Sequence, residues 1–221
     1  MEKEKEVRKF KEIEEGIHES IKVVFLGDSG VDKIGIISRF VSYTFDTTLT
    51  MHGSFFLMTL GFSELKSSIT FELWDTAGQK KYMSLNRMFF IDAKVFILVY
   101  DITRKDSFES IKNYWYEEVK NNCKNNPILA VVANKCELFE EEEVNEEEAF
   151  EFAKKIGAIF QRVSVAKSWG INELFYNIGI TYLTGNINKE EKSINKEKTN
   201  RRIKLDIKKE KNFNKKNCII I

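Results

Sequence analysis

The chain has 221 residues, a formal net charge of +1 and 43% hydrophobic residues, which suffices for one domain with a buried core. It contains no apolar run of the ~18 residues that a membrane-spanning helix needs, and its first residues, MEKEKEVRKFKEIEEG, are charged where a signal peptide would be apolar. The three cysteines, Cys123, Cys136 and Cys218, lack metal-ligand spacing. We therefore expect a cytosolic protein without a disulfide framework.

Six runs rich in β-branched and aromatic residues predict six strands. They lie at 21–27, 54–60, 69–75, 95–101, 128–134 and 158–165. Segments with helical spacing separate most of them, such as SFESIKNYWYEEVKNN, whose apolar face holds Phe108, Ile111, Trp115 and Val119. Apolar strands alternating with helices predict an α/β fold, with a six-stranded, mostly parallel sheet flanked by helices on both faces. The second and third strands lack an intervening helix, so we expect an antiparallel hairpin at one edge.

We expect the folded domain to cover residues 20–184. A charged extension over 1–19 precedes it, and a flexible basic tail over 185–221 follows, where Lys, Asn and Glu replace periodic apolar residues.

The loop GDSGVDKIG, residues 27–35, joins the first predicted strand to a segment that favours a helix. A glycine-rich loop at this place predicts an anion site, because free backbone N–H groups and the helix dipole converge there. The loop departs from the pattern GxxxxGK[ST] at two of its four defining positions. Asp32 replaces a glycine, and Ile34 replaces a hydroxyl residue.

Two more polar motifs stand at the ends of predicted strands. Asp75 in WDTAGQ ends the third strand, and Asn134 in NKCE ends the fifth. Ligands of open α/β sheets bind at these carboxyl ends. We therefore expect both residues to lie near the glycine-rich loop.

WDTAGQ, YDIT at 100–103, NK at 134–135 and INELF at 171–175 occur in one characteristic order and spacing. Together they resemble the small GTPases of the Ras superfamily and, within it, the Rabs, over residues 21–183. The resemblance implies a P-loop NTPase small G domain that binds GTP or GDP with Mg²⁺. The nucleotide-binding set that it implies is Gly27, Asp28, Ser29, Gly30, Val31, Asp32, Lys33, Ile34, Phe45, Asp75, Gly78, Asn134, Lys135, Glu137, Val165 and Ala166.

Individual roles follow from the same resemblance. Lys33 would reach the outer phosphates, Asp75 would hold Mg²⁺ through water, and the backbone N–H of Gly78 would contact the terminal phosphate. Gln79 is the candidate catalytic residue, because it would orient the attacking water. The base would be contacted by Asn134, Lys135 and Glu137, which read guanine, and by Phe45, which packs against its edge.

Departures from the family pattern affect the phosphate and metal contacts. Asp32 puts a side chain and a negative charge where glycine lets a phosphate approach. Two unit charges about 4 Å apart repel by roughly 4 kcal/mol at an effective dielectric near 20. Ile34 removes a hydroxyl that should ligate Mg²⁺, a cation that prefers oxygen. The family's second ligand, a threonine, aligns with Met51, although Thr50 is the weak candidate if the loop slips by one residue.

The guanine motifs also depart from the pattern. Glu137 replaces an aspartate and is one methylene longer, which we expect to cost about 1–3 kcal/mol of binding. The last motif, SAK in the family, is either Ser164-Val165-Ala166 or Val165-Ala166-Lys167, and neither register is intact. We therefore expect GTP and Mg²⁺ binding to be impaired, and hydrolysis more so, although Gln79 is retained.

The last four residues, Cys218-Ile219-Ile220-Ile221, match the C-a-a-X prenylation pattern, with Cys218 as the lipidation site. Residues 201–218 hold eight Lys or Arg against two acids, and a lipid chain plus a basic segment is what stable anchoring needs. The final isoleucine favours geranylgeranyl over farnesyl, although Rabs more often end in two cysteines. The alternative is a solubilising or nucleic-acid-binding arm, and the lack of aromatic residues other than Phe213 in this tail disfavours RNA binding.

Two functions from different classes remain. The first is a monomeric, Rab-like GTPase in vesicle traffic, at the cytoplasmic face of an intracellular membrane and with a cytosolic pool. Its partners would be guanine nucleotide, a membrane, a prenyltransferase, escort proteins, and effectors bound by the segments after Phe45 and Gly78, without nucleic acid. The second is a pseudo-GTPase, a prenylated binding module that recruits partners without nucleotide cycling. A third, an ATP-using P-loop enzyme, requires NKCE to be accidental.

Overall fold

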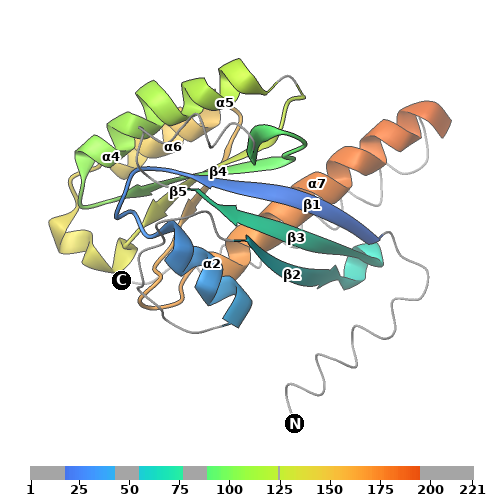
Figure 1. Ribbon diagram of the computed structural model, residues 1–221, viewed down its shortest axis with the longest axis horizontal. Helices are drawn as coiled ribbons and strands as arrows, with labels where there is room; N and C mark the ends of the chain where they lie inside the picture. The colour runs from blue at the N-terminus through green and yellow to red at the C-terminus, as the bar shows by residue number, and fades with distance from the viewer. Residues whose placement is uncertain (1–17, 43–54, 77–88, 124, 195–221) are drawn as a thin grey trace, which may run out of the picture. The chain divides into compact units, whose positions relative to one another are not determined.

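The structure is a computed structural model that describes residues 18–42, 55–76, 89–123 and 125–194. The chain divides into two compact units, Met1–Thr181 and Tyr182–Ile221. The sheet and most of the helices belong to the first unit (Figure 1). The predicted amino-terminal extension lies largely outside the described residues, and so does the tail from residue 195.

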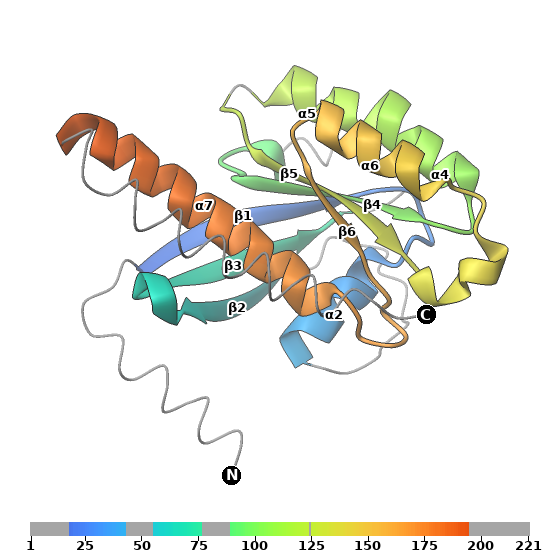
Figure 2. The same ribbon diagram turned by 180° about the vertical axis from the view of Figure 1, so that it is seen from behind.

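Six strands form one sheet in the order β2-β3-β1-β4-β5-β6. Their bounds are β1 His18–Leu26, β2 Phe55–Phe62, β3 Ser67–Asp75, β4 Val95–Asp101, β5 Ile128–Asn134 and β6 Ile159–Arg162. β2 and β3 pair antiparallel, and the other neighbours pair in parallel. Figure 2 shows β6 beside β5 at the edge opposite to β2. The predicted six-stranded sheet with an antiparallel edge pair is confirmed.

The helices that connect the strands are mostly short. Their bounds are α2 Lys33–Ser42, η1 Ser63–Leu65, α4 Lys105–Ser110, η3 Ile111–Trp115, α5 Tyr116–Asn122, η4 Cys136–Glu141, α6 Glu146–Lys155 and α7 Ile171–Ile194. The predicted helix after β4 exists as α4, a π-helical turn η3 and α5 in succession. Among the described residues, no helix has the length and apolar composition to cross a bilayer.

One face of the sheet packs against α4, η3, α5 and α6 (Figure 1). Alternate residues of β1 and β4 lie here, and the predicted apolar face of the helical stretch covers them, as expected from the period-2 alternation of strands. The buried residues of this face include Val24, Leu26, Phe96, Leu98, Phe108, Ile111, Trp115, Val119, Ala149 and Ala153.

The opposite face of the sheet holds an aromatic cluster. Phe175, at the start of α7, stacks on Phe40 of α2 with ring centroids 3.6 Å apart, and it contacts Phe71 of β3 edge-on. Phe25 of β1 completes the cluster. Helices thus cover both faces of the sheet, which leaves its carboxyl edge to the loops.

Two elements differ in length from the prediction. β6 ends at Arg162, because Ser164 bridges instead to Trp169 and the chain turns back. α7 continues to Ile194, whereas the sequence predicts a flexible tail from residue 185.

Candidate functional site

The loop between β1 and α2 lies at the carboxyl end of the parallel strands (Figure 1). Gly27 has φ of +147°, and a Cβ there would lie 2.3 Å from the carbonyl oxygen of Val99 in β4. Only glycine fits this approach, so the loop leaves β1 directly beside β4. Gly30 and Asp32 follow with φ of +82° and +66°, left-handed values that turn the chain into α2.

Lys33 begins α2 and turns its side chain back into this loop. Its Nζ donates to the carbonyl oxygens of Gly27 at 2.9 Å and Asp28 at 3.2 Å, and only 7% of the residue is exposed. Burial lowers its pKa, while the carboxylates of Asp75, Asp28 and Asp32 oppose that shift. An ammonium has three N–H donors, and the described residues take two of them, which leaves one for a ligand of the loop.

The Asp32 carboxyl caps the start of α2. Its Oδ1 accepts the N–H of Gly35 at 3.1 Å, and a Cβ at Gly35 would lie 2.4 Å from both carboxylate oxygens. Burial raises the pKa of Asp32, and the hydrogen bond from Gly35 opposes this shift. The charges that also act on it are those of Lys135, Asp75 and Glu137. Asp32 is therefore within electrostatic reach of both the WDTAGQ and the NKCE motifs.

The residues expected to contact Mg²⁺ are poorly suited to that cation. Asp75 ends β3 and is 3% exposed, whereas Ile34 in the first turn of α2 offers no oxygen. Among the described residues, no three His, Cys, Asp or Glu side chains group so as to hold a metal ion. Met51 and Thr50 lie outside the described residues. Of the two side-chain ligands that the resemblance implies, the first is thus replaced by an apolar side chain, and the second lies outside the described residues.

The NKCE motif presents two buried acceptors. Asn134 is fully buried at the end of β5, where its Nδ2 donates to the carbonyl oxygen of Val31 at 2.9 Å. Its Oδ1 and the Oε2 of Glu137 are buried, and neither has a hydrogen-bond partner in the part of the chain that the structure describes. Buried acceptors without donors are costly. A ligand that pairs with these two acceptors must carry N–H donors, as the imino and amino groups of guanine do.

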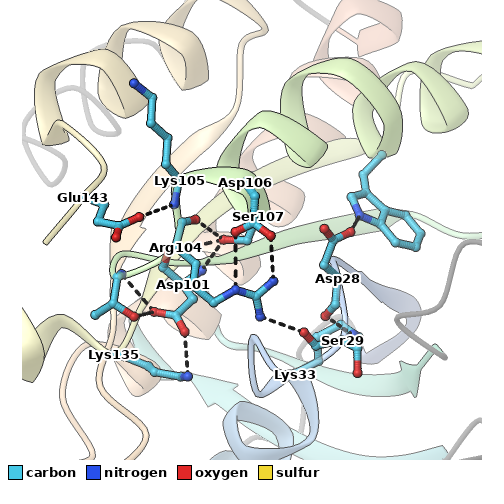
Figure 3. A network of polar contacts seen from close by, with 12 residues as sticks. Asp28, Ser29, Lys33, Asp101, Arg104, Lys105, Asp106, Ser107, Lys135 and Glu143 are labelled. Atoms are coloured by element: carbon cyan, nitrogen blue, oxygen red, sulfur yellow. Dashed lines mark hydrogen bonds and ion pairs between the residues drawn. The ribbon is translucent and has the colours of Figure 1, made fainter. Parts of the chain in front are cut away.

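Lys135 connects this motif to the end of β4. Its backbone has φ of +64°, and its Nζ lies 2.6 Å from Oδ2 of the fully buried Asp101 (Figure 3). The other oxygen of Asp101 accepts hydrogen bonds from the backbone N–H and the hydroxyl of Thr103. Asp101 thereby fixes the Lys135 side chain beside the site.

The loop after β6 contains both candidate registers of the last guanine motif. Ser164 is buried and its Oγ accepts the N–H of Lys167 at 3.0 Å. Val165 is buried, and its carbonyl oxygen accepts the Nε–H of Arg39 in α2 at 2.9 Å. Ala166 and Lys167 are exposed. The loop is thus tied to α2 through Val165.

Two contacts to the loop of residues 27–35, called the phosphate loop below, could not be predicted from the sequence. Trp115 donates from Nε1 to Oδ1 of Asp28 at 2.8 Å, and Arg104 donates from its guanidinium to the carbonyl oxygen of Ser29 at 2.9 Å (Figure 3). Arg104 also pairs with Asp106. The sequence signals only that Trp115 belongs to a buried helix face, and it carries no signal for Arg104.

The remaining expected site residues lie outside the described residues. They are Phe45, Gly78, Gln79 and the lipidation candidate Cys218.

Comparisons with known proteins agree with this geometry. The chain matches a family model described as the Ras family over residues 22–184. It is 38% identical over 161 residues to the Ras-related protein Rab-22A of Homo sapiens, covering 72% of this chain and 81% of that protein. It is 39% identical over 161 residues to Rab-31 of Mus musculus, with 72% and 80% covered. It is 36% identical over 159 residues to RHN1 of Nicotiana plumbaginifolia, with 71% and 78% covered.

Proposed function

The chain is a Rab-like small GTPase of the Ras family, and on this premise we propose that it is a membrane-anchored switch of vesicle traffic whose GTP and Mg²⁺ binding is impaired. The observation that carries the proposal is the contrast between the two ends of the site. At one end, the buried acceptors of Asn134 and Glu137 suit a guanine base. At the other end, Asp32 and Ile34 replace groups that a phosphate and its cation need.

The residues of the chain support binding in defined ways. The close passage of Gly27 along β4 shapes the loop, and the Lys33 ammonium provides a donor for a phosphate oxygen. The Asn134 amide, fixed by its bond to Val31, holds an acceptor toward the base. A bound guanine nucleotide would supply the phosphoryl group that is hydrolysed. Gln79 remains the proposed residue that orients water.

Partner binding is proposed for the face of β2. Phe55 and Leu57 are 46% and 55% exposed on this edge strand, and the Phe55 ring packs on Trp74 of β3 with centroids 4.6 Å apart. Exposed apolar side chains that gather on one face favour protein interactions. We propose effectors as the partners here, and attachment to a membrane through prenylated Cys218 and the basic residues of 201–218.

A second candidate function is a pseudo-GTPase that recruits partners without nucleotide cycling. It is favoured by the contacts of Lys33, Arg104 and Trp115, which hold the phosphate loop by groups of the chain itself. A loop that is held in this way does not depend on a nucleotide for its shape.

One experiment separates the two candidates. The full chain is purified in Mg²⁺ buffer and denatured, and the released nucleotide is quantified by chromatography. We expect guanine nucleotide at well below one molecule per chain. One molecule per chain would contradict impaired binding, and complete absence, even after incubation with excess GTP, would leave only the pseudo-GTPase.

A further inference from the structure

The phosphate loop has an excess of negative charge. Residues 27–35 contain two aspartates and one lysine. Asp75 adds a third carboxylate that acts on Lys33 together with Asp28 and Asp32. Asp28 accepts a hydrogen bond from Trp115, a neutral donor. Within the described part of the loop, a ligand phosphate therefore meets Asp32 as a carboxylate that the family pattern lacks.

Two cations must be weighed against this excess: Lys135, whose charge acts on Asp32 while its Nζ pairs with Asp101, and Arg104. Its guanidinium donates to the carbonyl oxygen of Ser29, and it pairs with the Asp106 carboxylate at 3.3 Å. Part of its charge is thus balanced by its own neighbour. Arg104 also contacts the loop at a different place from Asp32. It bonds to the backbone oxygen of the exposed Ser29, whereas Asp32 lies at the start of α2.

The amino-terminal end of α2 is already bound by a carboxylate. Helix N-termini attract anions because their first N–H groups lack partners within the helix. In this chain the Oδ1 of Asp32 accepts the N–H of Gly35, which takes one of these donors, and its negative charge faces the helix dipole. A phosphate at this place would compete with Asp32 for the same end of the helix.

The end of the site that is proposed to bind the base favours ligand binding, in contrast to the phosphate end. The Oδ1 of Asn134 and the Oε2 of Glu137 are buried acceptors that have no partner among the described residues, so they favour a ligand with N–H donors. This contribution comes from the base and does not grow with the number of phosphates. Ile34 removes the oxygen through which a cation could screen the phosphate charge.

We propose that this site prefers guanine ligands with few phosphates: guanosine and GMP bind at least as tightly as GTP, and Mg²⁺ adds no affinity for GTP. The inference rests on the guanine site of the proposed function. Each added phosphate brings negative charge toward Asp32, which we expect to cost on the order of tenfold in affinity between GMP and GTP.

Isothermal titration of the full chain tests this order. The chain is freed of nucleotide and titrated with guanosine, GMP, GDP and GTP, each with Mg²⁺ and with a chelator. We expect GMP to bind at least as tightly as GTP in both buffers. GTP binding a hundredfold tighter than GMP, or a large gain from Mg²⁺, would overturn the inference while leaving a guanine nucleotide switch intact. No binding of any guanine ligand would overturn both.

Two variants show whether charge is the cause. Asp32→Asn keeps an oxygen that can accept the N–H of Gly35 and removes the charge. We expect about tenfold tighter GTP binding and a much smaller change in guanosine binding. Glu151→Gln, which makes the same chemical change on the exposed side of α6, should alter neither. An equal gain for guanosine and GTP in Asp32→Asn would contradict a charge effect, and thermal melting of each variant confirms that it is folded.

Discussion

Asp32 keeps the backbone shape of the loop while changing its chemistry. Its φ of +66° lies in the left-handed region, where aspartate and asparagine are the most tolerated residues after glycine. The side chain then caps α2 through Gly35, as short polar side chains do at helix starts. The sequence predicts the loss of glycine at this position, but it does not reveal that the replacement satisfies a helix donor.

The buried position of Asp32 predicts a pH dependence of stability. Because burial raises its pKa in the folded protein, its contribution to stability is complete below the unfolded pKa of about 3.9 and is lost as the pH rises through the folded pKa. Asp32→Asn should therefore match the parent near pH 3.5 and be more stable at pH 7. The measurement is the free energy of unfolding in urea across this range.

The difference in the free energy of unfolding between Asp32→Asn and the parent reports mainly on Asp32, because the other ionisable groups are present in both proteins. The charges of Asp75, Glu137 and Lys135 also act on Asp32. These groups are present in both proteins. A stability difference that does not change with pH would show that Asp32 is already solvated like an unfolded aspartate.

Repair of the two phosphate-loop departures should restore the family's ligand preference. Asp32→Gly together with Ile34→Thr removes a carboxylate and supplies a hydroxyl to the cation. We expect Mg²⁺-dependent GTP affinity to rise by about a hundredfold or more, as measured by titration. Glu117→Gln on α5 is the matched control for charge. If the double variant binds GTP no better than the parent, the defect lies at the base end, where Glu137 is the first candidate.

At the scale of the element, the helical stretch after β4 shows what spacing can and cannot predict. The apolar positions Phe108, Ile111, Trp115 and Val119 follow the helical period, and all four are buried as expected. The π-helical turn that ends at Trp115 leaves no such signature. The hydrogen bond from Trp115 to Asp28 joins residues far apart in sequence, which periodicity within one segment cannot detect.

The Trp115–Asp28 hydrogen bond should contribute measurably to stability. Trp115→Phe removes the donor from a half-buried carboxylate and leaves a smaller ring in the core, so we expect a loss of about 3 kcal/mol in the free energy of unfolding. In the background of Asp28→Ala the same substitution should cost about 1–2 kcal/mol less. Urea denaturation of the four proteins gives this coupling. Equal costs in both backgrounds would show that the bond contributes nothing.

The sequence predicts that β6 and α7 exist, but it predicts their lengths less well. The apolar run 158–165 reads as one strand, but the last part turns back because Ser164 pairs with Trp169. Helix α7 runs to Ile194 although the sequence beyond residue 184 is polar. Local composition does not encode a tertiary bridge, and a polar segment with good helix formers can extend a helix that has already begun.

At the scale of the whole molecule, topology brings the motifs together. Strands β1, β3, β4 and β5 run in parallel, so the residues after Leu26, Asp75, Asp101 and Asn134 all lie at the carboxyl edge. The sequence predicts this arrangement because each motif follows an apolar strand. It does not predict the orientation of Arg104 or Lys135, since such side-chain contacts depend on loops that the strand pattern leaves undetermined.

We propose that membrane association depends on Cys218 and not on the other two cysteines of the chain. Cys218→Ser should remove the lipid acceptor, and the protein should move from the membrane fraction to the cytosolic fraction when cells are fractionated. Cys123→Ser, at the carboxyl-terminal end of α5, is the matched control and should leave the distribution unchanged. Membrane recovery of Cys218→Ser equal to that of the parent would contradict lipid anchoring.

The bonds that Lys33, Trp115 and Arg104 make to the β1–α2 loop have an evolutionary consequence. In a lineage whose loop is shaped by intramolecular bonds, substitutions that abolish ligand affinity need not unfold the protein. Selection for catalysis can then relax while selection for surface recognition continues. We expect relatives that share these bonds to depart from the family pattern first at positions 32 and 34, as this chain does. The residues that bond to the loop should change last.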